Sequence, residues 1–493
     1  MKTIFAALLF LCATCVVFGQ DHQPALTIYN GNFVVVREHV PLELKTGTNQ
    51  IDYNGVTSHL EPDSVILRDP AGRALQILEQ NYRNDPISQE LLLSRYEGKT
   101  IDFIVRQDGA KLETVKGKII RSGYIASSAY AGNYPQPGMG QPIIEIDGVL
   151  RFGLPGQPLF PSLDTDSILK PTLSWLLRTD KPGALDAEIS YVSGGMTWQS
   201  DYNLVIADKV DSKTGTNMVD LVGWITMQNH TGKTFENARI KLLAGDVNKV
   251  QPLPASRVYA MEAKAMDAVA ATAPVTEKSF DEFHLYTLQR DTTLRDEQTK
   301  QVEFVRAEGI RAQRLYIYDG GQAGAYYYGG VIQDPSYGTQ SNPKIWVMQE
   351  FKNSEANHLG MPLPKGRLRF YRRDTDGQLE VVGENTIDHT PKDETIRVYT
   401  GNAFDTVGER KQTNFHIDSR MHWMDETYEI RVRNHKKEPV QVRVVEHLYR
   451  CNNWKLVDSS ATYRKSDAHT VEFPINVAPD GEQIVTYTVH YTW

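Results

Sequence analysis

Three kinds of side chain in this sequence could do chemistry, and the first is a group of possible metal ligands, His416, Asp418 and His422. Histidine and aspartate both bind Zn²⁺ in proteins. On a single strand, however, the two histidines would lie about 20 Å apart, because a strand rises by about 3.3 Å per residue. One ion could contact both only if the chain turned between them, and neither a His-Glu-x-x-His motif nor a Cys-x-x-Cys pair occurs. We therefore predict no metal site and no cofactor.

Paired carboxylates are the second kind. Asp164 and Asp166 follow a proline-rich joint, and Asp281 lies next to Glu282. Glycoside hydrolysis requires two carboxyl groups about 5 Å, or about 6.5 to 9.5 Å, apart across a cleft. The chain carries 61 acidic residues, so such pairs also arise by chance, and no Gly-x-Ser-x-Gly elbow or phosphate-binding glycine loop accompanies them. We predict no catalytic residue and keep a carboxylate-dependent hydrolase as the alternative.

Tyrosines in glycine-rich loops are the third kind, and they favour binding. One loop spans residues 319–344 and the other spans residues 123–140. A tyrosine ring offers a large flat face at low entropic cost, and small neighbours let a ligand such as a sugar ring approach it. The alternative is a pair of hairpin insertions whose tyrosines pack back onto their own sheets. The candidate binding residues are Tyr326, Tyr327, Tyr328 and Tyr337 in the first loop, and Tyr124, Tyr130 and Tyr134 in the second.

The start of the chain has the pattern of a secretory signal. Lys2 is followed by an apolar run to Phe18, and Val17 and Gly19 are small residues suited to a cleavage site. This run is too short to span a membrane, and no later stretch reaches the roughly 18 apolar residues that a spanning helix needs. The formal net charge of -8 is spread along the chain without a basic block, which argues against a nucleic-acid partner.

Only one cysteine, Cys451, lies outside the predicted signal, because the other two of the three are Cys12 and Cys15. No disulfide can then form within the exported chain, so stability must come from the size of its cores. The alternative to a reactive thiol is a small buried apolar group, and we predict that for Cys451.

The elements that would hold these residues are strands. Apolar residues alternate with polar residues over 484–493 and 428–433, and 440–444 resumes the same period after a turn. Such two-faced strands are typical of antiparallel sandwiches. Helical periodicity is confined to 88–96 and to an alanine-rich stretch, 255–273, which lacks caps and is interpreted as a linker. The predicted fold class is all-β: several stacked antiparallel β-sandwich domains with a small β-barrel-like unit and few helices.

Shifts in composition predict the domain organisation. After the signal at 1–19 we expect an N-terminal β-module at 20–95, a small barrel-like unit carrying a Tyr/Gly loop at 96–160, a large β-domain at 185–375 and a C-terminal β-sandwich at 376–493. The last residue, Trp493, resembles the final aromatic residue of an outer-membrane barrel, but arginines on the outward faces of several strands argue against such a barrel. We predict that Trp493 belongs to a core.

Several stretches resemble the mucoidy inhibitor A-like family of bacterial envelope proteins, whose C-terminal region is a β-rich domain of unknown function. The similar stretches are 189–192, 195–202, 228–233, 242–245, 283–288, 434–440 and 453–455, together with Leu294 and Val302. Trp198, Tyr202, Asn229, Tyr286, Asn434 and Trp454 are structural motif positions within them. The resemblance implies an exported bacterial protein of stacked β-domains, linked to repression of exopolysaccharide production, with no established reaction. Typical members carry a long coiled coil where this chain has its small unit.

Together these observations predict an exported, non-catalytic envelope protein in the periplasm or on the cell surface. It would act by binding or scaffolding, with an envelope protein or a glycan as partner and no transmembrane segment after signal removal. The alternatives are a hydrolase acting on envelope polysaccharide and a purely structural spacer.

Overall fold

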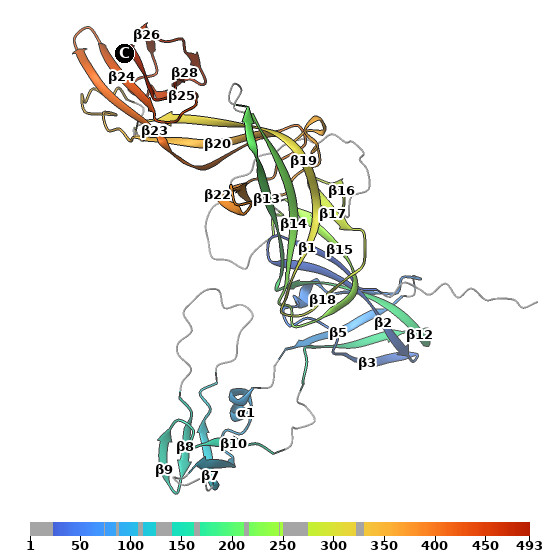
Figure 1. Cartoon of the computed structure of the whole chain (residues 1–493). Coiled ribbons are helices and arrows are strands. Elements are labelled where there is room, and N and C mark those ends of the chain that lie inside the picture. The colour runs from blue at the N-terminus through green and yellow to red at the C-terminus, as the bar shows by residue number, and fades with distance from the viewer. Residues whose placement is uncertain are drawn as a thin grey trace, which may run out of the picture.

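The computed structural model describes residues 23–72, 74–84, 88–106, 112–124, 141–161, 168–211, 216–245, 247–249, 275–321 and 330–493. These residues form 29 strands, one α-helix and two short 3-10 helices, Pro62–Ser64 and Glu355–Asn357 (Figure 1). The all-β prediction is confirmed. The predicted signal and the stretch 255–273 lie outside the described residues.

The first strands of the chain share a sheet with strands that follow much later. The eight strands of this sheet are β1 (Ala25–Tyr29), β2 (Phe33–Leu44), β4 (Ile66–Arg68), β12 (Gly183–Gly194), β15 (Phe235–Ala244), β16 (Val275–Phe280), β17 (Phe283–Leu288) and β18 (Thr292–Leu294). β12 pairs with β2 over the full length of both strands. The pairing therefore crosses from the predicted N-terminal module into the region predicted as a separate domain.

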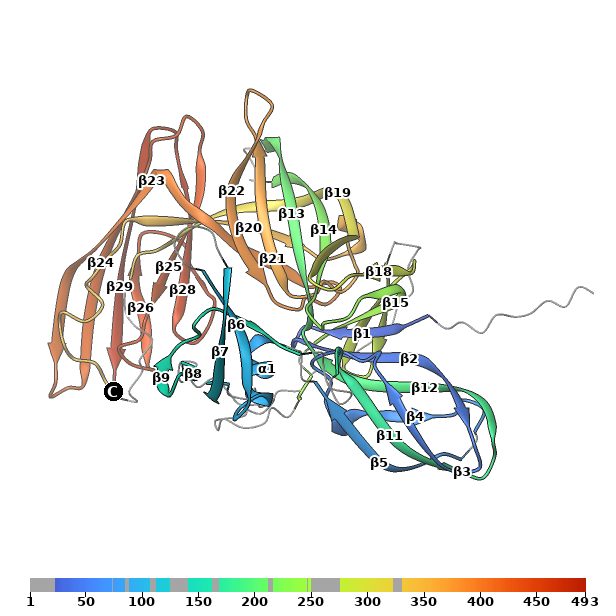
Figure 2. The same ribbon diagram turned by 90° about the horizontal axis from the view of Figure 1, so that it is seen from below.

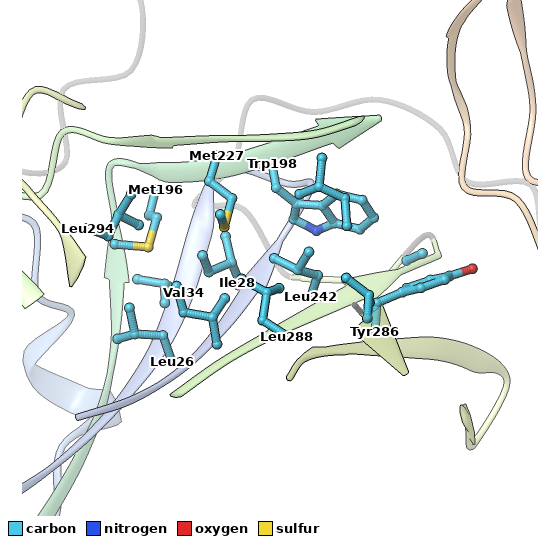
Figure 3. Close-up of a cluster of buried hydrophobic side chains, with 14 of the residues drawn as sticks. Leu26, Ile28, Val34, Met196, Trp198, Met227, Leu242, Tyr286, Leu288 and Leu294 are labelled. Atoms are coloured by element: carbon cyan, nitrogen blue, oxygen red, sulfur yellow. The ribbon is translucent and has the colours of Figure 1, made fainter. Parts of the chain in front are cut away.

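Alternation of side chains explains why this sheet packs. Buried and partly exposed residues alternate along β12 from Leu185 onward, so one face is apolar throughout. Figure 3 shows this core, where Ile28 and Val34 from the first strands meet Trp198, Met227 and Tyr286 from later strands. These residues belong to one continuous apolar cluster, which we term the first core.

A three-stranded sheet carries a long insertion. Its strands are β3 (Gly47–Tyr53), β11 (Thr172–Thr179) and β5 (Gln76–Arg83), in that order. Arg83 pairs with Thr172, although 88 residues of chain separate them. The segment between β5 and β11 is thus an insertion into a hairpin-like pair.

That insertion folds around its own small core. Its strands are β10 (Gln157–Leu159), β6 (Thr100–Arg106), β7 (Leu112–Arg121), β8 (Ile143–Ile146) and β9 (Val149–Phe152), in sheet order, beside the helix α1 (Gln89–Arg95). Ser88 caps α1 by accepting a hydrogen bond from Leu91 N, which confirms the predicted helix at 88–96.

The predicted barrel-like form of this unit is corrected by its topology. The sheet is open, and β9 and β10 form its two edges in the described part of the chain. Both edge strands are short, with four and three residues, and closure into a barrel requires strands whose number, tilt and stagger agree.

The remaining strands form one 13-stranded sheet. They are β13 (Met196–Asp211), β14 (Thr216–Asn229), β19 (Gln298–Asp319), β20 (Lys344–Lys352), β21 (Gly366–Arg373), β22 (Leu379–Ile387), β23 (Thr395–Asp418), β24 (Trp423–Asn434), β25 (Val440–His447), β26 (Trp454–Ser459), β27 (Arg464–Lys465), β28 (Thr470–Val477) and β29 (Gly481–Thr492). The 24-residue strand β23 connects two parts of this sheet (Figure 2). One part holds β13, β14, β21 and β22, and the other, which we term the C-terminal sandwich, holds β24, β25, β26, β28 and β29. β20 pairs with it across the boundary predicted at residue 376.

Most described strand pairs are antiparallel, as predicted, and three are parallel. The parallel pairs are β1 with β15, β13 with β21, and β19 with β25. Parallel neighbours cannot be joined by tight hairpins. They arise here because distant parts of the chain return to the same sheet.

In the described ranges, no helix has the length and apolar character needed to cross a membrane.

Candidate functional site

The candidate site is a buried charge cluster in the C-terminal sandwich, which consists of Arg410, Glu426, Glu446 and Arg450. β23, β24 and β25 supply the first three residues, and Arg450 follows β25. All four side chains are between 1% and 5% exposed. Charges this deeply buried are stable only when they are paired and hydrogen-bonded.

One half of the cluster joins Arg410 to Glu446. The Arg410 Nε donates to Glu446 Oε1 at 2.9 Å and to Oε2 at 3.0 Å. Tyr487 donates its hydroxyl to Glu446 Oε2 at 2.5 Å, and the guanidinium lies 3.7 Å above the centre of the Tyr428 ring. Burial alone would lower the pKa of Arg410, but the Glu446 carboxylate outweighs burial and raises that pKa above its ordinary value.

The other half joins Arg450 to Glu426. A single oxygen, Glu426 Oε1, accepts from Arg450 Nη2 at 2.8 Å, from Gln412 Nε2 at 2.7 Å and from the Tyr428 hydroxyl at 2.7 Å. The Arg450 guanidinium also packs 4.9 Å from the centre of the Phe415 ring. Three donors therefore fix the position of Glu426 Oε1.

The two arginines also bind the main chain of residues 330–341, which we term the anchored loop. Arg450 Nη1 donates to Ile332 O at 3.1 Å and to Asp334 O at 2.7 Å. Its Nη2 donates to Tyr337 O at 2.8 Å, and Arg410 Nη1 donates to Gly338 O at 2.6 Å. The loop is thus fastened through four carbonyl oxygens that would otherwise need water.

A third contact lies where β19 ends and the chain leaves for this loop. Asp319 Oδ2 is 3.0 Å from His447 Nε2, and the His447 ring stacks on Tyr449 at 5.2 Å between centres. The hydrogen bond to Asp319 raises the pKa of His447 above its ordinary 6.5 against the opposing effect of burial. The charge of His447 therefore contributes to holding the end of β19.

The cavity beside the cluster measures only about 20 Å³. Pockets that enclose a small-molecule ligand are roughly 300 to 1,000 Å³. A sugar residue cannot enter, and the Glu426 and Glu446 carboxylates are already engaged by arginine and tyrosine. In this conformation the cluster is suited to hold the loop rather than to cleave a substrate.

A larger open cleft, of about 600 Å³, is lined by two other carboxylates, Asp201 and Asp388. Asp201 Oδ1 accepts from Arg367 Nη2 at 3.0 Å, and its Oδ2 accepts from Thr226 Oγ1 at 3.0 Å. Both carboxylate oxygens of Asp201 therefore already accept hydrogen bonds from neighbouring side chains.

The tyrosines chosen from the sequence fall in different places. Tyr326, Tyr327, Tyr328, Tyr130 and Tyr134 lie outside the described residues. Tyr337 is half-buried in the anchored loop, with the Arg450 guanidinium 5.4 Å from its ring centre. Tyr124 is half-buried after β7 in the inserted unit, where its backbone N–H donates to Ser122 Oγ at 3.1 Å. The two described tyrosines thus lie outside the strands, in two separate parts of the molecule.

The other chemistry-bearing candidates do not converge. His416 packs against Trp423 and His422 packs against Trp493, while Asp418 accepts the backbone N–H groups of Arg420 and Met421. The described residues hold no group of three or more His, Cys, Asp or Glu side chains suited to a metal ion. Asp281 and Glu282 are exposed in the turn between β16 and β17, whereas Asp164 and Asp166 lie outside the described ranges.

Cys451 and Trp493 both pack in the C-terminal sandwich. Cys451 is a buried free thiol, as predicted, and its Sγ donates to Thr492 O at 3.3 Å. Trp493 is partly buried and packs against the apolar core of this sandwich, which we term the second core.

The structural motif positions are mostly core residues. Trp198, Tyr202 and Tyr286 are 1% to 2% exposed in the first core, while Trp454 is half-buried and donates its Nε1–H to Ala468 O at 3.0 Å. Asn229 and Asn434 are fully buried. Because the amide of Asn229 is enclosed, the Asn229-His230-Thr231 sequon offers no accessible acceptor for a glycan.

Asn229 and Asn434 make the same pattern of hydrogen bonds in two different turns. The Nδ2 of Asn229 donates to Lys233 O, Leu294 O and Arg295 O, and its Oδ1 accepts from Thr231 N. The Nδ2 of Asn434 donates to Glu438 O, Val477 O and Ala478 O, and its Oδ1 accepts from Lys436 N. Each side chain thus fastens its own turn to a distant segment.

Sequence reasoning missed the charge cluster, although the strand pattern contains a signal for it. Along β24, Met424, Glu426, Tyr428 and Ile430 all occupy the buried phase. Along β25, Glu446 follows Val440, Val442 and Val444 in the same phase. A carboxylate in an otherwise apolar phase predicts a buried ion pair, because an unpaired buried charge would be too costly.

Comparison with known proteins adds no relative: the chain matches no protein-family model, and no curated protein is significantly similar to it.

Proposed function

We propose that this chain is an exported binding protein of a bacterial cell envelope and that it presents the anchored loop to a glycan or to another envelope protein. It works without catalysis, in the periplasm or on the cell surface. The observation that carries the proposal is the use of two buried arginines to fasten four carbonyl oxygens of one loop.

Burying two ion pairs costs desolvation energy, so we expect the order that they give the loop to have a function. Replacing a buried ion pair by apolar groups is often neutral or stabilising, so such a pair is weak evidence for stability alone. Here both pairs end on the same loop. Binding residues commonly lie on loops held by a rigid scaffold, and pre-ordering such a loop reduces the entropy lost on binding.

The exposed side of the loop supplies suitable chemistry. Gln333, Asp334 and Ser336 are exposed, and Tyr337 in the same loop is partly exposed. Amide, carboxylate and hydroxyl groups next to an aromatic ring are the groups that recognise polar ligands such as sugars. The signal-like start supports export of the chain. The resemblance to the mucoidy inhibitor A-like family supports a location in the envelope and a link to exopolysaccharide.

The experiment compares two matched variants on a glycan array and in a cross-linking pull-down from envelope extract. Gln333→Lys with Gln340→Lys changes the exposed side of the loop and leaves both arginines in place. Arg431→Met removes a partly exposed arginine from the outer face of the same sandwich, where it pairs with Glu482 at 2.9 Å. We expect the loop variant to lose ligands that the wild type and the Arg431 variant retain.

The proposal would be refuted if the wild type bound no ligand in either assay, or if the loop variant kept the same ligands as the wild type. The second outcome would favour the purely structural spacer.

A further inference from the structure

A pocket lined by three arginines lies away from the anchored loop, between β19, β25, β27 and β28. Arg314, Arg443 and Arg464 line it together with Tyr316, Gln441 and Pro474, and its volume is about 240 Å³. The pocket sits where β19 passes from one core to the other, since Ala312 belongs to the first core and Tyr316 to the second. Junctions of this kind are favoured places for ligand sites.

The charges in this pocket are unbalanced. Glu472 is the carboxylate nearest to two of the arginines, and its Oε2 accepts from Arg464 Nε at 2.8 Å and lies 3.5 Å from Arg443 Nε. Arg314 is half-buried, and its guanidinium has no hydrogen-bond or ion-pair partner among the residues that the structure describes. Three guanidinium groups against one carboxylate leave an excess of two positive charges.

A neighbouring lysine adds to this excess. The ammonium group of Lys436 donates to the Tyr316 hydroxyl at 2.7 Å and lies 4.8 Å from the centre of that ring. Tyr316 itself lines the pocket, so this positive charge contacts a residue of the pocket wall. Partly buried positive charges without counter-charges are destabilising, and a bound anion would offset that cost.

We infer that this pocket binds an oxyanion group, either the carboxylate of an acidic sugar or a phosphate. Guanidinium groups present paired N–H donors that match the oxygens of both groups. The volume falls below the range for drug-sized ligands and is suited to one charged sugar residue or one phosphate group. Glu472 keeps two of the arginines oriented, while Arg314 offers the unpaired donors.

The inference is independent of the proposed role of the anchored loop, because the pocket shares no residue with the loop or with the charge cluster. Loss of one activity would therefore leave the other measurable in the same full-length chain.

Isothermal titration of the full chain tests the site with trigalacturonate and, separately, with inorganic phosphate. The fully methyl-esterified trisaccharide is the neutral control ligand. We expect at least one of the two anions to bind, with an affinity that falls as salt is added. Tighter binding of trigalacturonate would identify the ligand group as a sugar carboxylate, and tighter binding of phosphate would identify it as a phosphate. Either result supports the site.

Arg314→Gln is the informative variant, and Arg311→Gln is its matched control on the same strand. Arg311 lines a different pocket and is exposed. We expect Arg314→Gln to weaken anion binding at least about tenfold, the size expected when a charge-assisted hydrogen-bond donor is lost. Arg311→Gln should bind as the wild type does.

Three results would overturn the inference: no binding of either anion to the wild type, equal binding by Arg314→Gln, or equal binding of the neutral ester. Should Arg314→Gln fail to fold, Arg464→Gln replaces it, since that side chain is 59% exposed and its loss disturbs no core.

Discussion

At the scale of single residues, Arg450 has the largest structural role in the candidate site. Its guanidinium binds one carboxylate and three loop carbonyls from a position that is 2% exposed. Neither the type of this residue nor its place in the sequence indicates that role. Its importance comes from partners up to 118 residues away, which only the folded sheet brings together.

Arg450→Met should therefore be strongly destabilising. Breaking a buried ion pair by removal of one partner costs about 3 to 5 kcal/mol, because the other charge stays buried. The double variant Arg450→Met with Glu426→Gln should recover part of that loss, since no unpaired charge then remains. Urea unfolding measures both variants, and a single variant as stable as Arg431→Met would contradict the assignment.

His447 gives the site a dependence on pH whose sign follows from its raised pKa. The folded pKa lies above the ordinary 6.5, first because of the hydrogen bond to Asp319 and further because of Glu446 and Asp467. The stabilisation is fully present below the unfolded pKa and is lost as pH rises through the raised folded pKa.

His447→Asn should therefore lose more stability at pH 5.5 than at pH 8.5. The free energy of unfolding at the two pH values measures this, and His416→Asn, an exposed histidine on β23, is the control. A loss that is larger at pH 8.5 would show that the His447 and Asp319 pair does not titrate in this way.

At the scale of elements, alternation in the sequence predicts the strands well and their partners poorly. The segments 428–433 and 440–444 form β24 and β25, with the expected face buried. A period of two fixes which side chains share a face, but it carries no information about which strand lies alongside. The parallel pairing of β19 with β25 is therefore not readable from either segment alone.

The two buried asparagines are the element-scale features that most resemble each other. Each Nδ2 donates to three carbonyl oxygens, so removal of either side chain leaves buried acceptors unsatisfied. Each of Asn229→Ala and Asn434→Ala should cost about 1 to 3 kcal/mol. Asn476→Ala is the control, since Asn476 is exposed on β28.

Thermal or urea unfolding would check this pair, and both variants should lower the stability of the chain. If one variant were as stable as Asn476→Ala, that turn would be held by its backbone alone.

At the scale of the whole molecule, the domain boundaries could not be placed from composition because the sheets are built from distant segments. β2 pairs with β12 and β20 pairs with β23, and both pairings cross expected boundaries. The inserted unit is the exception, since its chain enters and leaves between two paired strands, β5 and β11.

Replacing residues 85–167 by a short Gly/Ser linker should therefore leave the rest of the fold intact. Arg83 and Thr172 are paired neighbours, and paired residues in antiparallel strands lie only about 5 Å apart. Circular dichroism and the thermal midpoint measure the outcome. A shortened chain that no longer unfolds cooperatively would show that the unit contributes to the main cores.

Amide hydrogen exchange at the anchored loop most directly tests whether buried arginines order this loop for binding. Ile332 N donates to Arg450 O at 3.0 Å and Tyr337 N donates to Asp334 O at 3.1 Å, so both amides should exchange slowly in the wild type. In Arg450→Met we expect them to exchange at least about tenfold faster, relative to the core amides of β29, because a lost charged hydrogen bond is worth that factor or more. Equal exchange rates in the wild type and in Arg450→Met would show that Arg450 does not order the anchored loop.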